Sequence, residues 1–341
     1  MSEAVKIRDI EAKLGTKSFG YLKVHESDTL KVDMPLGIVN GAESGPTLAL
    51  TGAIFPTQFV GIEAAIRTYN EIDPKELKGV VLIVPVVDMI CLQEHIKQSV
   101  WISKGWTTID GVGVYPSFPG RPDGKISEII AYTLFQEVIL RSQYHIDLRG
   151  GDEKEMLISF TIYSDTGDAA LDAKTKAMAY GYGTEVVLHE EKNGAARAGS
   201  LLGEACRHGV ASITALAGRG QGRLDEEDVE IHMTGIENVM KYLGMLKGTP
   251  KPTKVKQRTE IPPVHYVSAK HGGLFYPKIE KWRPLGANVV KGELLGEIKS
   301  LKGEVLEEIR APIDGSFHLI FHYPAVRVGD RLMSFRRIRE E

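Results

Sequence analysis

Three polar residues, His145, Asp147 and Arg149, alternate along one apolar segment that has the character of a strand. Alternate residues of a strand share a face, so an imidazole, a carboxylate and a guanidinium are expected on one side of a sheet. Arg149 falls at the carboxyl end, where α/β proteins bind ligands, and a guanidinium can bind a carboxylate bidentately. The alternative role is an internal ion pair with Asp147, Asp152 or Glu153, and the two roles are compatible.

His145 and Arg149 are four residues apart along the strand, which is about 13 Å at ~3.3 Å per residue. That distance is too long for the two side chains to share a metal directly, since zinc–nitrogen bonds are about 2 Å. We therefore expect His145 to be a hydrogen-bonded core histidine. Cys91 and Cys206 are far apart in the sequence and predict buried thiols, with neither a disulfide framework nor a cysteine zinc cluster.

The composition is that of a soluble globular protein, with 43% hydrophobic and 26% charged residues in a chain of 341. The formal net charge of -3 leaves no basic surface for a nucleic acid, so no nucleic-acid partner is expected. No segment has the apolar length that spans a bilayer, which predicts no membrane partner and a cytoplasmic protein.

Apolar runs and helix-spaced segments alternate through the first two thirds of the chain. The expected strands are 47–54, 80–87, 144–148, 185–188 and 211–216, and the expected helices are 61–72, 127–140, 169–180, 200–208 and 226–246. Such alternation predicts an α/β fold with a mostly parallel or mixed sheet flanked by helices.

The amino-acid composition and the spacing of apolar residues change near residue 247. Residues 1–246 predict the α/β domain, with a β-rich extension at 1–35, and the Gly- and Pro-containing segment 247–258 predicts a linker. Short apolar runs separated by glycines fill 259–341 and predict a small all-β domain.

Three motifs in the first domain resemble those of one enzyme family. Leu50 to Ala64 has the form of a strand followed by His-Gly-x-Glu and a helix, and Asp147 to Gly150 resembles Asp-Leu-His-Gly. Ser212 to Gly218 resembles a strand that ends in a catalytic Glu before a Gly-rich loop. On these motifs the chain resembles the succinylglutamate desuccinylase/aspartoacylase family, whose fold is zinc carboxypeptidase-like.

The resemblance extends from about Pro35 to the end of the chain. Gly286 to Gly292 and Ala311 to Gly315 are similar to the small biotinyl/lipoyl-like barrel of the family. The segment Lys299 to Gly303 lacks the Met-Lys-Met of a biotin carrier, so the barrel implies a structural or oligomer-forming module.

The resemblance also implies two His and one Glu as zinc ligands and a second Glu as general base. Here the ligand positions carry Phe55, Gln58 and Arg149, and the general-base position falls on or near Leu216. A phenyl ring has no lone pair and a guanidinium is a permanent cation with no acceptor. An aliphatic side chain cannot accept a proton. We therefore expect a degenerate zinc site and no cofactor, with zinc present only if this ligand assignment is wrong.

A rebuilt polar cleft is the expected remnant of that site. The family's substrate-clamping Asn-Arg pair falls on Tyr115 and Pro116. The candidate ligand-binding residues around the cleft are Gln58, Asp88, Tyr115, Asp147, Arg149 and Arg219.

Three functions remain open on the sequence alone. The first is a metal-free relative of the family that binds or transforms a small carboxylate or amino-acid-derived ligand. The second is an active metal-dependent amidohydrolase of N-acyl amino acids whose unconventional site recruits His145, Asp147 or Asp152. The third is a non-catalytic structural subunit that partners an active homologue. The expected assembly is accordingly a homo-oligomer or a hetero-oligomer with a related subunit.

Overall fold

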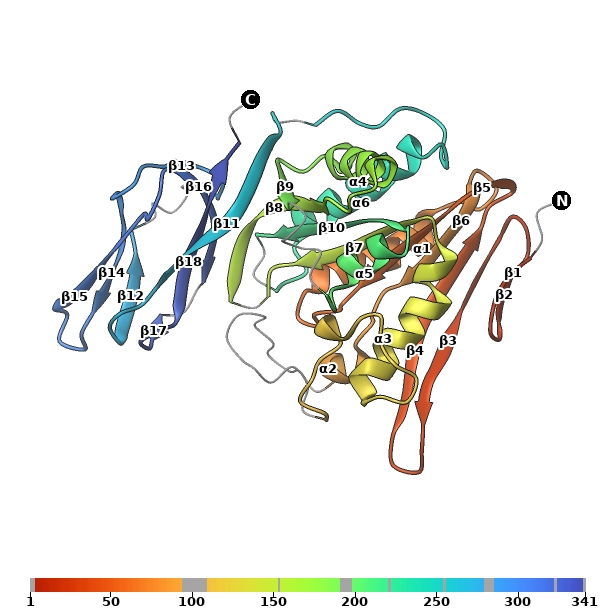
Figure 1. The fold of residues 1–341 in the computed structure, drawn as a ribbon, viewed down its shortest axis with the longest axis horizontal. Coiled ribbons are helices and arrows are strands. Elements are labelled where there is room, and N and C mark those ends of the chain that lie inside the picture. Colours follow the sequence, from red (N-terminus) through yellow and green to blue (C-terminus); the bar gives the residue numbers. More distant parts are fainter. Residues whose placement is uncertain are drawn as a thin grey trace.

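A single mixed sheet of twelve strands runs across the molecule (Figure 1). The computed structural model describes residues 4–93, 109–152, 154–190, 198–219, 222–253, 256–278, 285–321 and 324–339. The sheet strands are β3 (Thr16–Glu26), β4 (Lys31–Asn40), β5 (Glu43–Gly52), β6 (Lys78–Val84), β7 (Tyr144–Gly150), β8 (Glu155–Ser164), β9 (Val186–Glu190), β10 (Ala211–Gly218), β11 (Arg258–Ser268), β13 (Asn288–Val289), β16 (Gly315–Phe321) and β18 (Arg331–Ile338). Their order is β13-β16-β18-β11-β9-β8-β10-β7-β5-β6-β4-β3.

The helices predicted from hydrophobic spacing are present, with ends that differ by a few residues. They are α1 (Phe59–Glu71), α3 (Ile126–Glu137), α4 (Ala169–Tyr182), α5 (Leu201–Arg207) and α6 (Glu226–Tyr242), joined by the short α2 (Met89–Gln93). The prediction of a mixed sheet flanked by helices is confirmed. No helix in the described ranges has the length and apolar character needed to cross a bilayer.

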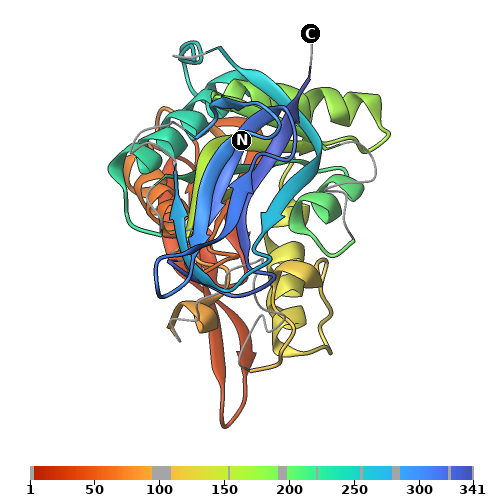
Figure 2. The same cartoon turned by 90° about the vertical axis from the view of Figure 1, so that its left-hand side faces the viewer.

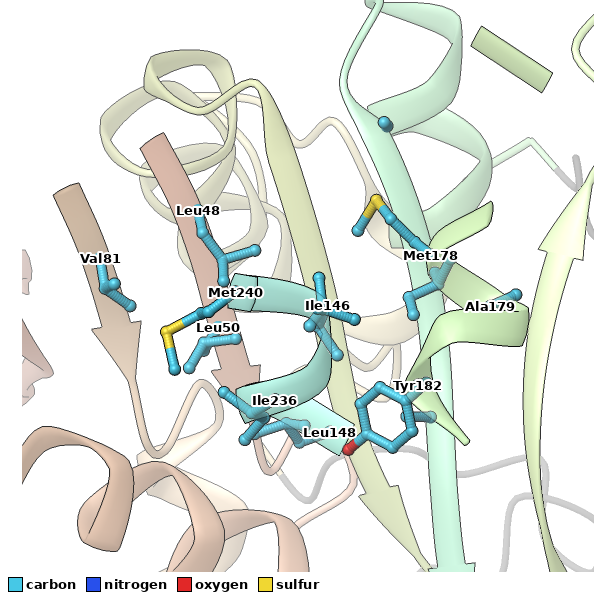
Figure 3. Packing of buried hydrophobic residues seen from close by; sticks show 14 of the residues in the cluster. Leu48, Leu50, Val81, Ile146, Leu148, Met178, Ala179, Tyr182, Ile236 and Met240 are labelled. Carbon is cyan, nitrogen blue, oxygen red and sulfur yellow. The ribbon is translucent and has the colours of Figure 1, made fainter. Parts of the chain in front are cut away.

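Two apolar layers hold the helices on the sheet. On one face α1, α4 and α6 pack on the central strands. Figure 3 shows side chains of α4 and α6 beside those of β5, β6 and β7, namely Leu48, Leu50, Val81, Ile146, Leu148, Met178, Ala179, Tyr182, Ile236 and Met240. On the other face α3 and α5 bury Leu134, Phe135 and Leu201. Gly61 permits the close approach of α1, because a Cβ atom there would lie 2.4 Å from the carbonyl oxygen of Leu148.

Three neighbouring strands, β5, β7 and β10, run parallel, and their carboxyl ends lie side by side. In this register Thr51 lies opposite Asp147, and Leu216 lies opposite Arg149. Ligands of α/β proteins bind at such an edge. The topology therefore brings the motifs of separate chain segments to one place.

The other half of the sheet closes on itself. Because β16 also pairs with β8, the strands β8, β9, β11, β18 and β16 form a closed five-stranded barrel. Two of these strands precede the expected linker and three follow it. A smaller sheet covers the barrel and contains β15 (Val305–Arg310), β14 (Leu294–Lys299), β12 (Gly273–Pro277) and β17 (Ala325–Val326). Figure 2 shows these C-terminal strands, in blue, in front of the helix-flanked sheet.

Candidate ligand-binding pocket

A pocket of about 570 Å³ lies where the parallel strands end and the barrel begins. The strand-end wall contains Phe55, Gln58, Tyr115, Arg149 and Leu216. The barrel wall contains Glu155, Leu157, Phe160, Tyr266, His318 and Arg336. Pockets of roughly 300–1,000 Å³ are typical of small-molecule sites in proteins.

The chain turns sharply after β5, and this turn presents Phe55 and Gln58. Ala53 adopts a left-handed conformation with φ 49°, which is uncommon for a residue other than glycine. The backbone N–H of Asp88 donates to the carbonyl oxygen of Ala53 at 3.2 Å and secures the turn. Gln58 then precedes α1, and its side-chain oxygen accepts a hydrogen bond from the backbone N–H of Gly150 at 3.4 Å.

Arg149 is the centre of the strand-end wall. Its guanidinium carbon lies 4.9 Å from the ring centroid of Phe55 and 4.8 Å from that of Tyr115. Both distances are within the range of cation–π attraction. Arg149 Nε donates to Asp147 Oδ2 at 2.5 Å, and the Arg149 side chain is only 11% exposed. The internal ion pair expected from the sequence is therefore formed with Asp147, while Glu153 lies outside the described residues.

A chain of buried hydrogen bonds supports Asp147 from below. Thr51 Oγ1 donates to Asp147 Oδ1 at 3.2 Å and lies 3.0 Å from His145 Nε2. Since the single hydroxyl proton is directed to the carboxylate, His145 Nε2 must donate to Thr51. His145 Nδ1 is then the acceptor for the hydroxyl of Ser212, 2.8 Å away. The prediction that His145 is a hydrogen-bonded core histidine is confirmed.

A second buried histidine, His232 on α6, supports the backbone of Arg149. Its Nε2 lies 2.8 Å from the carbonyl oxygen of Arg149 and donates to it, and its Nδ1 accepts from the hydroxyl of Tyr182 at 2.7 Å. No local sequence signal marks His232 as a residue of the site. It occupies an inward position of a predicted amphipathic helix, so the sequence pattern does not distinguish it from an ordinary core residue.

Burial controls the charge state of these groups. It lowers the pKa of His145 to about 3, with the nearby Arg149 charge adding to the effect. It lowers the pKa of His232 to about 4, although the hydrogen bond to the Arg149 carbonyl opposes the shift. Burial works against the charge of Arg149, but attraction to Asp147 outweighs it and raises the Arg149 pKa. Both histidines are therefore neutral at physiological pH.

The two neutral histidines make the protein less stable in acid. Below the ordinary histidine pKa of 6.5 the unfolded chain binds protons that the folded chain does not take up until about pH 4 or 3. Each histidine then lowers the free energy of unfolding by about 1.4 kcal/mol per pH unit as the pH falls through this window. Chemical denaturation between pH 7 and pH 4 measures the slope.

The His232→Gln variant isolates one histidine from the other titrating groups. The variant is expected to lose about 1.4 kcal/mol per pH unit of that slope. The variant must be compared with the wild type because burial also raises the pKa of Glu155 well above its ordinary range. A raised carboxyl pKa makes the folded state more stable as the pH falls, which is opposite to the effect of the histidines. An unchanged slope in the variant would show that His232 is not held neutral.

Two of the sequence candidates lie away from the pocket wall. Asp88 is buried, and its Oδ1 accepts from the backbone N–H of Cys91 at 3.0 Å at the start of α2. Arg219 is about half exposed, and its Nη2 lies 3.9 Å from Glu185 Oε2. Gln58, Tyr115 and Arg149 line the pocket, while Asp147 lies fully buried behind Arg149.

The donor set at the strand ends does not fit zinc. Phe55, Gln58 and Arg149 converge there, and they supply a hydrocarbon ring, a neutral amide and a cation. Catalytic zinc takes His, Cys, Asp or Glu donors. Within the described ranges, no three such side chains are grouped closely enough to hold a metal ion.

The barrel wall contributes polar residues that the sequence analysis missed. Glu260 pairs with His318 Nδ1 at 3.0 Å and with Arg258 Nε at 3.3 Å. Arg336 on β18 and Glu155 on β8 line the pocket nearby in the same wall. They come from strands that pair only when the barrel closes, so no local sequence signal connects them to Arg149.

Known proteins with the same architecture match this chain over nearly its full length. N-alpha-acetyl-L-2,4-diaminobutyric acid deacetylase of Halomonas elongata is 25% identical over 331 residues, which is 94% of this chain and 92% of that protein. The product-bound ectoine utilization protein EutE (DoeB) of Ruegeria pomeroyi is 23% identical, with a TM-score of 0.81 and 98% of both chains covered.

A third protein carries the family description itself. The succinylglutamate desuccinylase/aspartoacylase of Rhodobacter sphaeroides is 24% identical, with a TM-score of 0.81 over 99% of this chain and 98% of that one. No family model matches the chain. The resemblance to the succinylglutamate desuccinylase/aspartoacylase family is confirmed by the curated relative and the shared architecture, and this chain carries the fold of that family from end to end.

Proposed function

We propose that this protein is a metal-free relative of the family that binds a small carboxylate or amino-acid-derived ligand in the pocket beside Arg149. One observation carries the proposal. The position at which the family resemblance implies a zinc ligand is occupied by a guanidinium that lies within cation–π distance of Phe55 and Tyr115 and is paired with Asp147. A fixed cation at that position repels a metal ion and attracts an anion.

The ligand class is supported by the chemistry of the pocket and by the relatives. A guanidinium has five N–H donors, and the Asp147 bond uses only the one on Nε. The rings of Phe55 and Tyr115 lie beside each other, with centroids 4.9 Å apart, and both are within cation–π distance of the guanidinium. The Halomonas relative is named for a deacetylase of an N-acetylated amino acid. N-Acyl amino acids combine a carboxylate with an amide and are the compounds to test first.

The absence of a general base at Leu216 also supports binding without zinc hydrolysis. Leu216 lines the pocket opposite Arg149 in the strand register and cannot take a proton from water. Gln58 and Tyr115 can donate or accept hydrogen bonds, which suits ligand recognition. The second candidate function, an amidohydrolase with a displaced metal, would need donors from His145 or Asp147. Both are fully buried and already hydrogen bonded.

Metal analysis and ligand binding test the proposal together. Untagged protein purified without chelators is expected to carry essentially no zinc by elemental mass spectrometry. It is also expected to leave N-alpha-acetyl-L-2,4-diaminobutyrate intact while its Tm rises in the presence of N-acyl amino acids. A ligand at 100 times its Kd stabilises the folded state by about 2.7 kcal/mol, so the shift is measurable.

The other outcomes identify the alternatives. Close to one zinc per chain, with chelator-sensitive hydrolysis, would establish the amidohydrolase instead. Co-purification with a zinc-bearing homologue from the source cells, with no ligand-induced change in Tm, would favour the structural subunit.

A further inference from the structure

Arg336 is a buried cation in the barrel wall of the pocket. It belongs to β18, is 7% exposed, and lines the same pocket as Arg149. Its neighbour Arg337 is exposed. Alternate residues of a strand point to opposite faces, so Arg337 carries the same charge away from the pocket.

The Arg336 guanidinium lacks a direct partner within the part of the chain that the structure describes. Its buried Nε has no hydrogen-bond acceptor among those residues. Glu190 and Glu260 attract it only from longer range. Glu260 is already engaged by His318 and Arg258. Burying a charge without a partner is costly, so an anion that enters beside Arg336 recovers free energy.

The positive charge at the other end of the pocket is already balanced. Arg149 forms a 2.5 Å ion pair with the fully buried Asp147. A ligand anion therefore gains more at Arg336, which forms no ion pair with a described carboxylate, than at Arg149, although Glu190 in the same pocket and Glu260 attract Arg336 from longer range. The pocket therefore contains one arginine in an ion pair, Arg149, and one arginine whose Nε has no acceptor, Arg336.

The wall between these ends is largely apolar. Leu157, Phe160, Leu216, Val264 and Leu319 face the cavity, which has a volume of about 570 Å³. Apolar walls favour a ligand with a hydrocarbon or aromatic body. The pocket thus combines one cation, Arg336, whose Nε has no acceptor, with a surface for an apolar group.

Glu155 does not cancel the charge of Arg336. Its Oε1 is buried and has no hydrogen-bond partner among the described residues. Burial and the nearby Asp152 raise the pKa of Glu155 well above its ordinary range, which favours the neutral form of the carboxyl group. A protonated carboxyl both donates and accepts hydrogen bonds, which suits the amide or carbonyl of a ligand.

We propose that Arg336 is the carboxylate anchor of the pocket and that the ligand is a monocarboxylate with an apolar body. The assignment of an amino acid to the ligand rests on the proposed function. On that basis the ligand is an N-acyl amino acid with a medium-length or aromatic acyl group. The carboxylate lies at Arg336 and the acyl group lies against Phe160 and Leu157.

Calorimetric titration at pH 7 tests the anchor with three probes, namely hexanoate, N-hexanoylglycine and the neutral N-hexanoylglycinamide. The wild-type chain is expected to bind both acids, and Arg336→Gln to weaken each by roughly 10- to 100-fold, the value of hydrogen bonds to a charged group. The matched control Arg337→Gln changes the same charge on the outer face and is expected to stay within about twofold. Arg336→Lys keeps the charge and should bind the acids better than Arg336→Gln.

The neutral amide separates recognition from folding. It should bind weakly to wild type and equally weakly to Arg336→Gln. The apo variant should melt at or above the wild-type temperature, because an unpaired buried charge has been removed. If Arg336→Gln instead melts lower, and acid and amide lose affinity in parallel, Arg336 is structural and the inference is wrong.

The probes also separate this inference from the proposed function. If both acids bind the wild type and Arg336→Gln with equal affinity, Arg336 is not the carboxylate anchor, and the proposal that the pocket binds a ligand is unaffected. Arg336-dependent binding of hexanoate without any binding of N-hexanoylglycine supports the anchor and removes the amino-acid class. Failure of both acids to bind the wild-type chain overturns the anchor and the proposed binding function together.

Discussion

Arg149→Met is expected to lower the free energy of unfolding by about 3–5 kcal/mol at pH 7, the usual cost of removing one partner of a buried ion pair. The reason is the environment of Asp147. This carboxylate is fully buried, and Arg149 is the cation that hydrogen bonds to it. Without the guanidinium the charge stays in a dry site or the carboxyl group takes up a proton, and either outcome destabilises the folded state.

A double-mutant cycle separates this effect from lost packing. Asp147→Asn in the Arg149→Met background removes the uncompensated charge and is expected to restore most of the loss. The matched control Arg219→Met removes a half-exposed arginine whose acidic neighbour is 3.9 Å away, and should change stability by less than about 0.5 kcal/mol. Urea denaturation provides the free energies of the wild type, the Arg149→Met and Asp147→Asn single variants, the double variant and the control. Equal losses for Arg149→Met and Arg219→Met would contradict the argument.

The triple variant Phe55→His, Gln58→Glu, Arg149→His is expected to bind one zinc ion per chain, at least about 1,000-fold more tightly than wild type. The three side chains already converge on one spot. Phe55 stacks on Arg149, and the Gln58 side chain reaches the backbone of Gly150. Two imidazoles and a carboxylate at these positions supply the donors that the wild-type set lacks. The zinc would also compensate the charge of Asp147.

Zinc content by elemental mass spectrometry and the shift of Tm on adding zinc measure the result. A chain with Arg219→His alone introduces one histidine outside the pocket and serves as the control for adventitious binding. Hydrolysis is not expected in the triple variant, because the general-base position implied by the resemblance falls on or near Leu216, whose side chain cannot accept a proton. A triple variant that folds but binds no more zinc than the control would show that these positions do not form a degenerate metal site.

Local patterns were sufficient for most of the regular structure. Apolar runs and 3.6-residue spacing identified β5, β6, β7, β9 and β10 and the five longer helices. The start of α6 is also local, since Asp225 caps the helix by accepting from the backbone N–H of Asp228 at 3.2 Å. These features depend on residues close in sequence, which is why the sequence predicts them.

Strand β8 was not predicted from the sequence, so the strand pairings that it makes were not predicted either. It enters between β9 and β10 and is antiparallel to β10, which interrupts the parallel half of the sheet. It also pairs with β16 from the far end of the chain. A βαβ pattern predicts parallel neighbours, so a strand that follows β7 directly and reverses direction has no place in that reading.

By itself, the sequence determined the resemblance to the family, and it predicted that Phe55, Gln58 and Arg149 lie at strand ends, at the positions where that resemblance implies zinc ligands. The tertiary structure decided what those side chains contact: Asp147 as the partner of Arg149, His232 behind its carbonyl, and the stacking of Phe55 with Tyr115. It alone placed Arg336 in the pocket, through closure of the barrel by β16 and β8. The physical reason is that local propensity depends on neighbouring residues, whereas the partner of a buried charge depends on strand pairings between distant segments.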